Sequence, residues 1–192
     1  MKTIVNVIDL DDTLLKTDSS MLFYRWLLLR RPWIATILIS RFLKILPEEK
    51  MKKLLYLSGK KAFTAAGADF LNRLGQEIDQ KLIEHMHTYT DPSQTTVVFS
   101  ASFDFYVVPF IRSLGFAGYG STMDPGGKFR HLKREEKINL LQELFPPERS
   151  DYNYAVSDSH SDEGLLEKFR YGFLIKKESA EYQYEICKPH GL

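Results

Sequence analysis

Carboxylates gather in two short clusters, each directly after an apolar run. They are Asp9, Asp11 and Asp12 in the first cluster, and Asp158 and Asp162 in the second. Carboxylate oxygens bind Mg²⁺, exchange protons with a reacting group, and attack phosphorus as nucleophiles. The two clusters together predict a cation site with a reactive carboxylate, although turn formation or helix capping would explain either cluster alone.

The segments around these clusters alternate between strand and helix patterns. Strands are predicted at 3–10, 95–100, 116–121, 152–157 and 171–176, and helices at 103–114, 134–145 and 162–169. Such alternation predicts a parallel sheet with helices on both faces, in which ligands bind at the carboxyl ends of the strands. Consecutive helical patterns from about 19 to 90 interrupt the alternation. We therefore expect an α/β core of residues 1–17 and 91–192 with an inserted all-helical cap of residues 18–90.

The overall composition is that of a soluble globular protein. The 192 residues carry 26 Lys and Arg against 25 Asp and Glu, a net charge of +1, so no nucleic-acid partner is expected. Cys187 is the only cysteine, which argues against an internal disulfide and favours a reducing cytoplasm. No apolar stretch of signal-peptide length follows Met1, so export is not expected. The composition leaves the oligomeric state open.

Four groups of residues occur in a fixed order along the chain. They are Asp9-Leu10-Asp11-Asp12-Thr13, then Val98-Phe99-Ser100, then Lys137 on a predicted helix, and finally Asp158 with Asp162. This order resembles the four motifs of the haloacid dehalogenase-like (HAD) superfamily, which implies a Rossmann-like α/β core. The helical insertion after the first motif resembles the phosphoserine phosphatase branch, in which a small helical cap covers the site.

The resemblance implies a Mg²⁺-dependent phosphatase and a role for each motif residue. Asp9 would be the nucleophile that forms an aspartyl-phosphate, and Asp11 the general acid and then base. Mg²⁺ would be held by Asp9, Asp158 and the main-chain carbonyl of Asp11, with Asp162 and Thr13 supporting these ligands. The phosphoryl group would be bound by Ser100, the backbone at Ala101, and Lys137. Lys133 competes for the third motif, but Lys137 is preferred because an apolar helix face starts just after it.

Some residues depart from the family pattern or bear on the substrate. Asp12 and Ser157 stand where many relatives have glycine, which alters backbone freedom. Asp18 and His160 are candidates for substrate contact. Asp18 lies near the position of a glutamate that reads the amino group in phosphoserine phosphatases, but it is shorter, so phosphoserine is not favoured.

The segment 22–46 is basic and aromatic. It contains Trp26 and Trp33 among arginines, and no acidic residue occurs from Ser19 to Pro47. The arginines interrupt it too often for a membrane-spanning helix. With Ser100-Ala101-Ser102 it has a looser resemblance to phosphatidylglycerophosphatase C, which suggests peripheral contact with an anionic membrane. The alternative is that this segment packs inside the cap through its apolar residues, Leu22, Trp26, Leu29 and Ile37.

The predicted substrate is therefore a small phosphorylated metabolite or a lipid phosphate such as phosphatidylglycerophosphate. Two alternatives remain, a phosphoserine phosphatase and a catalytically silent protein that binds a phosphorylated ligand. The silent alternative would keep the fold but would need to lose the nucleophile or the metal ligands, and Asp9, Asp11, Lys137 and Asp158 are all present.

Overall fold

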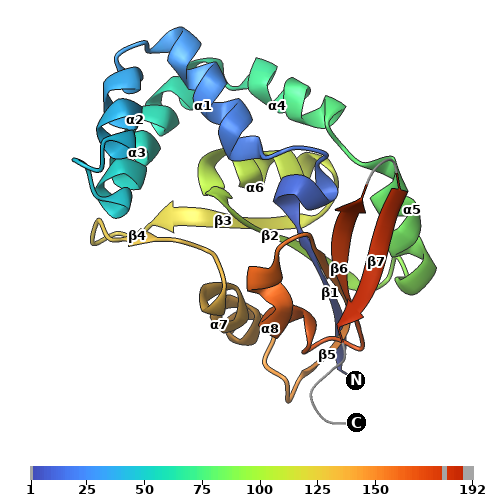
Figure 1. The fold of residues 1–192 in the computed structure, drawn as a ribbon. Helices are drawn as coiled ribbons and strands as arrows, with labels where there is room; N and C mark the ends of the chain where they lie inside the picture. Colours follow the sequence, from blue (N-terminus) through green and yellow to red (C-terminus); the bar gives the residue numbers. More distant parts are fainter. Residues whose placement is uncertain (1, 179–180, 188–192) are drawn as a thin grey trace.

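The computed structural model describes residues 2–178 and 181–187, and its centre is one seven-stranded sheet (Figure 1). The strand order is β4-β3-β2-β1-β5-β6-β7. The strands are β1 (Thr3–Asp9), β2 (Thr95–Phe103), β3 (Ala117–Met123), β4 (Phe129–Arg130), β5 (Ser150–Ser157), β6 (Tyr171–Glu178) and β7 (Glu181–Cys187). The strand that carries the first carboxylate cluster therefore lies in the middle of the sheet.

The inner strands are parallel, and the two edges are antiparallel. β1 pairs in parallel with β2 and with β5, whereas β4 pairs antiparallel with β3, and β7 with β6. The expected Rossmann-like core is confirmed. The predicted strand 171–176 was expected to be the last one, which is wrong, because β7 follows it and pairs with it at that edge.

Helices cover both faces of the sheet, as Figure 1 shows. One face carries α7 (Glu135–Leu144) and α8 (Glu163–Leu166), and the other carries α5 (Gln80–Tyr89) and α6 (Asp104–Ser113). The residues of β1 alternate between these faces, since side chains alternate along a strand. Val7 belongs to the core cluster that contains Leu141 of α7, and Ile8 to the cluster that contains Phe110 of α6.

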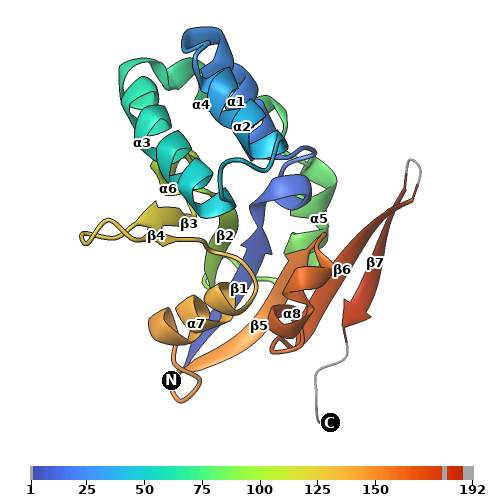
Figure 2. The ribbon, with the colours of Figure 1, turned by 60° about the vertical axis from the view of Figure 1, so that its left-hand side comes forward.

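A helical insertion leaves the core after β1 and lies beyond the carboxyl ends of the central strands (Figure 2). It comprises α1 (Ser19–Arg30), α2 (Ile34–Phe42), α3 (Glu48–Ala66) and α4 (Ala68–Gln76), and it follows a single π-helical turn, η1 (Leu10–Leu14). Phe23 of α1 stacks on Tyr106 of α6 with ring centroids 5.0 Å apart and meets Phe70 edge-on. Aromatic packing therefore fixes the insertion on the core.

Helix α5 follows the insertion and packs on the sheet. The His85 ring of α5 lies 3.0 Å from the Tyr154 hydroxyl of β5 and stacks on Tyr184 of β7. The expected boundaries of the cap, 18 and 90, stay a prediction.

Polar contacts also tie α3 to the core. The Tyr56 hydroxyl donates to Asp104 Oδ1 (2.9 Å), and Lys53 Nζ donates to the carbonyl of Gly127 (2.9 Å). Lys52 Nζ lies 3.0 Å from Nε2 of His131. The insertion is thus held at the β3–β4 hairpin and at the loop that leads to α7. None of the helices in the described part of the chain is both long and apolar enough to cross a bilayer.

Candidate active site

Strand pairing brings the two carboxylate clusters to one edge of the sheet. Ile8 of β1 lies opposite Val156 of the adjacent parallel strand β5. Asp9 directly follows Ile8, and Asp158 lies two residues after Val156, so both carboxylates lie at the same end of these strands. Asp162 lies in the short helical turn η2 (His160–Asp162) that follows β5. The two clusters, which are about 150 positions apart in sequence, thus share one site at the carboxyl ends of the strands, as expected.

Lys137 joins the clusters through two short ion pairs. Its Nζ lies 2.5 Å from Asp9 Oδ1 and 2.5 Å from Asp162 Oδ2, and the lysine is only 3% exposed. Lys137 reaches this position because it lies on the buried side of the first turn of α7. The competing Lys133 is exposed, so the structure places Lys137 at the site.

Burial strongly affects the pKa values of Asp9 and Lys137. Burial raises the pKa of Asp9 to about 7, and the ammonium of Lys137 only partly opposes this rise, while Asp162 and Asp11 add to it. Burial alone would lower the pKa of Lys137, but Asp9 and Asp162 outweigh burial, and the pKa is raised. Several carboxylates therefore share one ammonium group, and a further cation beside Asp9 would favour its ionised form.

Thr13 connects Asp9 with Asp158. Its hydroxyl lies 3.5 Å from Asp9 Oδ2 and 3.2 Å from Asp158 Oδ1, and it accepts a hydrogen bond from the amide of Asp158 (3.0 Å). The threonine is 2% exposed, so these contacts are shielded from water. Thr13 thus fixes the two carboxylates relative to one another, as expected of a residue that supports a metal ligand.

The donor set at this edge suits Mg²⁺. Mg²⁺ is usually bound by one or two carboxylates together with waters and substrate phosphate oxygens, and Asp9 and Asp158 provide two carboxylates that meet at one hydroxyl. Within residues 2–178 and 181–187, no group of three His, Cys, Asp or Glu side chains could hold a metal. A further protein ligand would be the main-chain carbonyl of Asp11, which stays a prediction.

The carboxylate of Asp11 is held on the side of the helical insertion. Its Oδ2 accepts from the hydroxyls of Ser100 and Ser102, each at 2.8 Å, and its Oδ1 accepts from the amide of Ser19 at 2.7 Å. Ser19 begins α1, so Asp11 connects the first residue of the insertion to the end of β2. Three donors fix the orientation of this carboxylate.

Ser102 is a site residue to which sequence reasoning assigned no role. Ser100 was expected to bind phosphate, and the structure shows it donating to Asp11 while it accepts from the amide of Ser102 (2.9 Å). The exposed Ala101 lies between them. The signal was the period of two in Ser100-Ala101-Ser102, because residues two apart in a strand share a face.

The two departures from glycine have different consequences. Asp12 has φ +52° and ψ 12°, in the left-handed region that glycine adopts most easily and that aspartate tolerates better than most residues. The hydroxyl of Ser157 donates to Asp162 Oδ2 (2.9 Å), a contact that glycine cannot make. Ser157 therefore helps to orient the carboxylate that pairs with Lys137.

The two candidates for substrate contact lie in other surroundings. Asp18 caps α1 by accepting from the amides of Ser20 (2.7 Å) and Met21 (3.2 Å), and burial raises its pKa. His160 has a side chain that is 73% exposed, and its Nδ1 lies 2.5 Å from Glu163 Oε1. Asp18 thus acts as the cap of α1, and His160 pairs with an exposed carboxylate.

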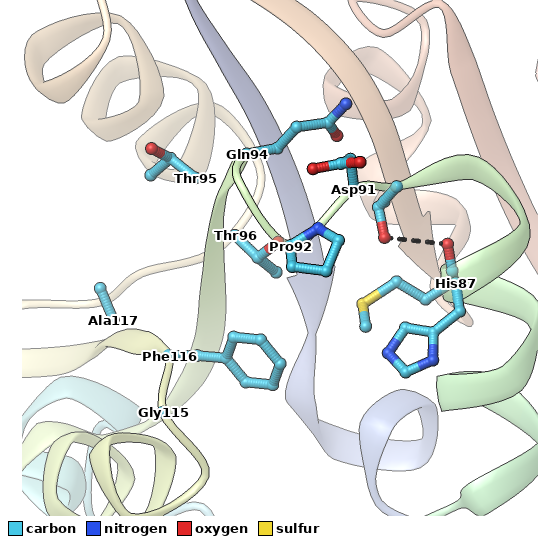
Figure 3. Close-up of a pocket in the computed structure, with 11 residues that line it drawn as sticks. His87, Asp91, Pro92, Gln94, Thr95, Thr96, Gly115, Phe116 and Ala117 are labelled. Atoms are coloured by element: carbon cyan, nitrogen blue, oxygen red, sulfur yellow. Dashed lines mark hydrogen bonds between the residues drawn. The ribbon is translucent and has the colours of Figure 1, made fainter.

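A separate cavity of about 640 Å³ lies at the other end of the parallel strands, where β2 and β3 begin (Figure 3). Its lining includes His87, Asp91, Thr95 and Phe116, from the segments that precede and begin β2 and β3. Because it is at the amino ends of the parallel strands, this cavity takes no part in the arrangement around Asp9.

The chain matches the haloacid dehalogenase-like hydrolase family over residues 7–167, a range that contains all four motifs. It therefore belongs to this family, and the expectation of an enzyme of this kind is confirmed. A search of curated proteins finds no match to the sequence.

Solved structures with a similar fold have low sequence identity. A protein of unknown function from Bordetella pertussis Tohama I is 17% identical, with a TM-score of 0.59 and coverage of 87% of each chain. A HAD family hydrolase from Salmonella enterica serovar Typhi is 13% identical, with a TM-score of 0.55 over 88% of this chain and 61% of that one. A phospho-aspartyl intermediate analogue of phosphoserine phosphatase is 16% identical, with a TM-score of 0.51 over 88% and 84%. These likenesses support the fold, and nothing in them supports the looser resemblance to phosphatidylglycerophosphatase C.

Proposed function

We propose that this protein is a Mg²⁺-dependent phosphomonoester hydrolase that acts through an aspartyl-phosphate on Asp9. The observation that carries the proposal is the buried ammonium of Lys137 between Asp9 and Asp162, with Thr13 joining Asp9 to Asp158. Such an arrangement neutralises negative charge next to a carboxylate that is held in a fixed position. This is the requirement for attack on a phosphate ester, whose own charge repels a nucleophile.

The proposed reaction has two displacements. In the first, an oxygen of Asp9 attacks phosphorus, the bond from phosphorus to the ester oxygen breaks, and Asp11 gives a proton to the leaving alcohol. In the second, Asp11 takes a proton from water, the water oxygen attacks phosphorus, and Asp9 is released as a carboxylate with inorganic phosphate. Mg²⁺ held by Asp9 and Asp158 would neutralise charge on the phosphoryl oxygens.

Lys137 and the serines support this chemistry in different ways. Lys137 keeps Asp9 in place and adds positive charge beside the phosphoryl group. Ser100 and Ser102 orient Asp11, and Ser19 links it to the helical insertion. A movement of the insertion that shifted α1 would therefore also shift the proposed general acid, which gives a cap a direct route to control turnover.

The proposed substrate is a small phosphorylated metabolite or a lipid phosphate. Phosphoserine is a weaker candidate, because Asp18 accepts hydrogen bonds from two backbone amides in the first turn of α1. A carboxylate engaged in this way has less capacity to read a substrate ammonium group.

The test is phosphate release by the purified protein with Mg²⁺ or with EDTA, across soluble phosphomonoesters, phosphoserine and lipid phosphates. We expect metal-dependent release that is abolished in Asp9→Asn. Release should be retained in Asp91→Asn, a matched change at the amino ends of the parallel strands. Wild-type rates in Asp9→Asn would refute the mechanism. Absence of release from every ester would favour the silent binding protein.

A further inference from the structure

The end of α2 exposes large apolar side chains. Ile39, Phe42, Leu43 and Ile45 are 56%, 85%, 58% and 73% exposed, and we call these four residues with Arg41 and Lys44 the α2 edge. On the alternative that the segment 22–46 packs inside, four residues should be buried, namely Leu22, Trp26, Leu29 and Ile37. Three of them are at most 8% exposed, but Leu29 is 82% exposed. The segment therefore has a packed side and an unpacked apolar side.

Helix α2 itself has two apolar faces. Ile34 and Ile37 are buried against the rest of the insertion, which accounts for the first face. Phe42 and Leu43 lie three and four residues after Ile39, so these three residues share the second face. A helix that needed only one contact surface would carry polar residues on the second face.

The turn after α2 presents a cation at the tip of this face. The amide of Ile45 donates to the carbonyl of Ser40 (2.9 Å) and that of Lys44 to the carbonyl of Arg41 (2.9 Å), the pattern of a Schellman cap. Lys44 holds the left-handed position with φ +58°, where glycine is preferred. An unfavourable backbone state at an exposed turn indicates that the lysine side chain has a use there.

The segment that carries the α2 edge contains charges of one sign only. No acidic residue occurs from Ser19 to Pro47, and the cations of this segment are Arg25, Arg30, Arg31, Arg41 and Lys44. Arg30 pairs with Asp69 and Arg41 lies 3.8 Å from Glu48, so the acidic partners come from outside the segment. Trp33, which precedes α2, is 50% exposed and adds an amphipathic ring of the kind found at membrane interfaces.

We propose that the α2 edge docks on the surface of an anionic lipid bilayer. Phe42 and Ile45 would enter the boundary between headgroups and acyl chains, while Lys44 and Arg41 would lie among the lipid phosphates. A second copy of the chain is a poorer occupant, because a two-fold contact through this face would bring cations against cations. Anionic lipid supplies both the apolar layer and the opposite charge.

The insertion that bears the α2 edge lies beyond the carboxyl ends of the central strands, where the proposed catalytic groups are also found (Figure 2). Arg41 contacts Glu48 at the start of α3. Burial raises the pKa of Tyr24 to about 12, and the charges of Asp18, Asp11 and Glu48 add to this rise. The charges of both Asp11 and Glu48 thus act on Tyr24 of α1. Docking would therefore place the lipid surface on the side of the molecule toward which the parallel strands point, whether or not a lipid is the substrate.

The first test is sedimentation of the full chain with vesicles of phosphatidylglycerol and phosphatidylcholine, and with vesicles of phosphatidylcholine alone. We expect binding to the anionic vesicles that weakens as NaCl is raised. The double variant Phe42→Ser with Ile45→Ser should bind at least roughly tenfold more weakly, because both side chains lose their apolar insertion. Ile186→Ser, which removes an apolar side chain that is 62% exposed on β7, should bind like the wild type.

A second variant separates docking from folding. Lys44→Gly removes one cation and relieves the left-handed backbone, so its melting temperature should be at least that of the wild type while its vesicle binding falls about fivefold. Lack of binding to anionic vesicles, or unchanged binding by the double variant, would overturn the proposal. A concentration-dependent dimer that requires Phe42 would also overturn it, in favour of a second copy as the occupant. Release of soluble phosphate esters should be unchanged in Lys44→Gly, which keeps this test separate from that of the proposed function.

Discussion

Replacing Lys137 by methionine would remove the ammonium group that pairs with both Asp9 and Asp162. Methionine keeps the unbranched shape of the lysine and is one heavy atom shorter, so most of the space stays filled while the charge is lost. Two carboxylates that are 8% and 3% exposed would remain with their cation missing. Breaking a buried ion pair in this way destabilises proteins by roughly 3–5 kcal/mol. For a chain of this size, that loss lowers the melting temperature by about 10 °C.

The loss should depend on pH in a defined direction. Without Lys137, the pKa of Asp9 rises further above its value of about 7, so the folded variant binds a proton that the unfolded chain has released at neutral pH. Stability then falls as pH rises from about 4, the ordinary pKa of aspartate, through the raised pKa of the folded state. The destabilisation should therefore be small near pH 4 and largest at pH 8.

Urea unfolding in EDTA at several pH values measures this effect without contributions from bound metal. Lys133→Met is the matched control, because this neighbouring lysine is exposed and its loss should change stability by less than about 0.5 kcal/mol. Adding Asp162→Asn to Lys137→Met should restore part of the loss, since one orphaned carboxylate becomes neutral. A loss below about 1 kcal/mol at pH 8, or a loss that is the same at pH 5 and pH 8, would refute the reasoning.

Three further predictions concern single residues, namely Ser102, Arg134 and His131. Ser102→Ala should lower kcat for phosphate release by about tenfold, because one charge-assisted hydrogen bond to Asp11 is lost while two donors remain; an unchanged kcat would contradict this positioning role. Arg134→Gly should raise the free energy of unfolding by about 1 kcal/mol, since φ +52° and ψ −125° at the start of α7 suit glycine; a lower urea midpoint would argue against this strain. Burial, Lys52 and Lys133 lower the pKa of His131 to about 4, so the unfolded chain takes up its proton first and the contribution of His131 to stability should fall as pH drops from 6.5 towards 4. The free energy of unfolding of His131→Gln, relative to that of the wild type, should therefore increase as pH drops over that range, and a difference that does not change with pH would exclude this role of His131.

The sequence predicted the parallel core well, because buried parallel strands consist of long apolar runs. Residues 3–9 and 95–100 are such runs, and they form β1 and the first part of β2. The antiparallel edges have no comparable signal. β4 is only two residues long, and β7 reads Glu-Tyr-Gln-Tyr-Glu-Ile-Cys, in which charged and polar residues interrupt the apolar ones. An edge strand is determined largely by its neighbour, which a local pattern does not contain.

The candidate site was predictable where local geometry decides it. Lys137 could be distinguished from Lys133, because the apolar face of the following helix fixes which lysine points inward. The surroundings of Asp11 could not be predicted in the same way. They depend on Ser19 and Ser102, which the fold brings together from 8 and 91 positions away. Ser157 was likewise interpreted only as a residue that replaces glycine, although its hydroxyl donates to Asp162.

The central position of β1 sets the order in which the protein can fold during synthesis. Both strands that pair with β1 emerge from the ribosome much later, β2 from residue 95 and β5 from residue 150. At about 5–20 residues per second, the apolar strand that ends in Asp9 waits roughly 7–30 s for its second partner. The helices of the insertion can form during this interval, since their hydrogen bonds are local. The nascent chain thus carries a hydrophobic strand that lacks at least one of its two partners until residue 157 is synthesised, and chaperones that bind such segments should associate with it before then.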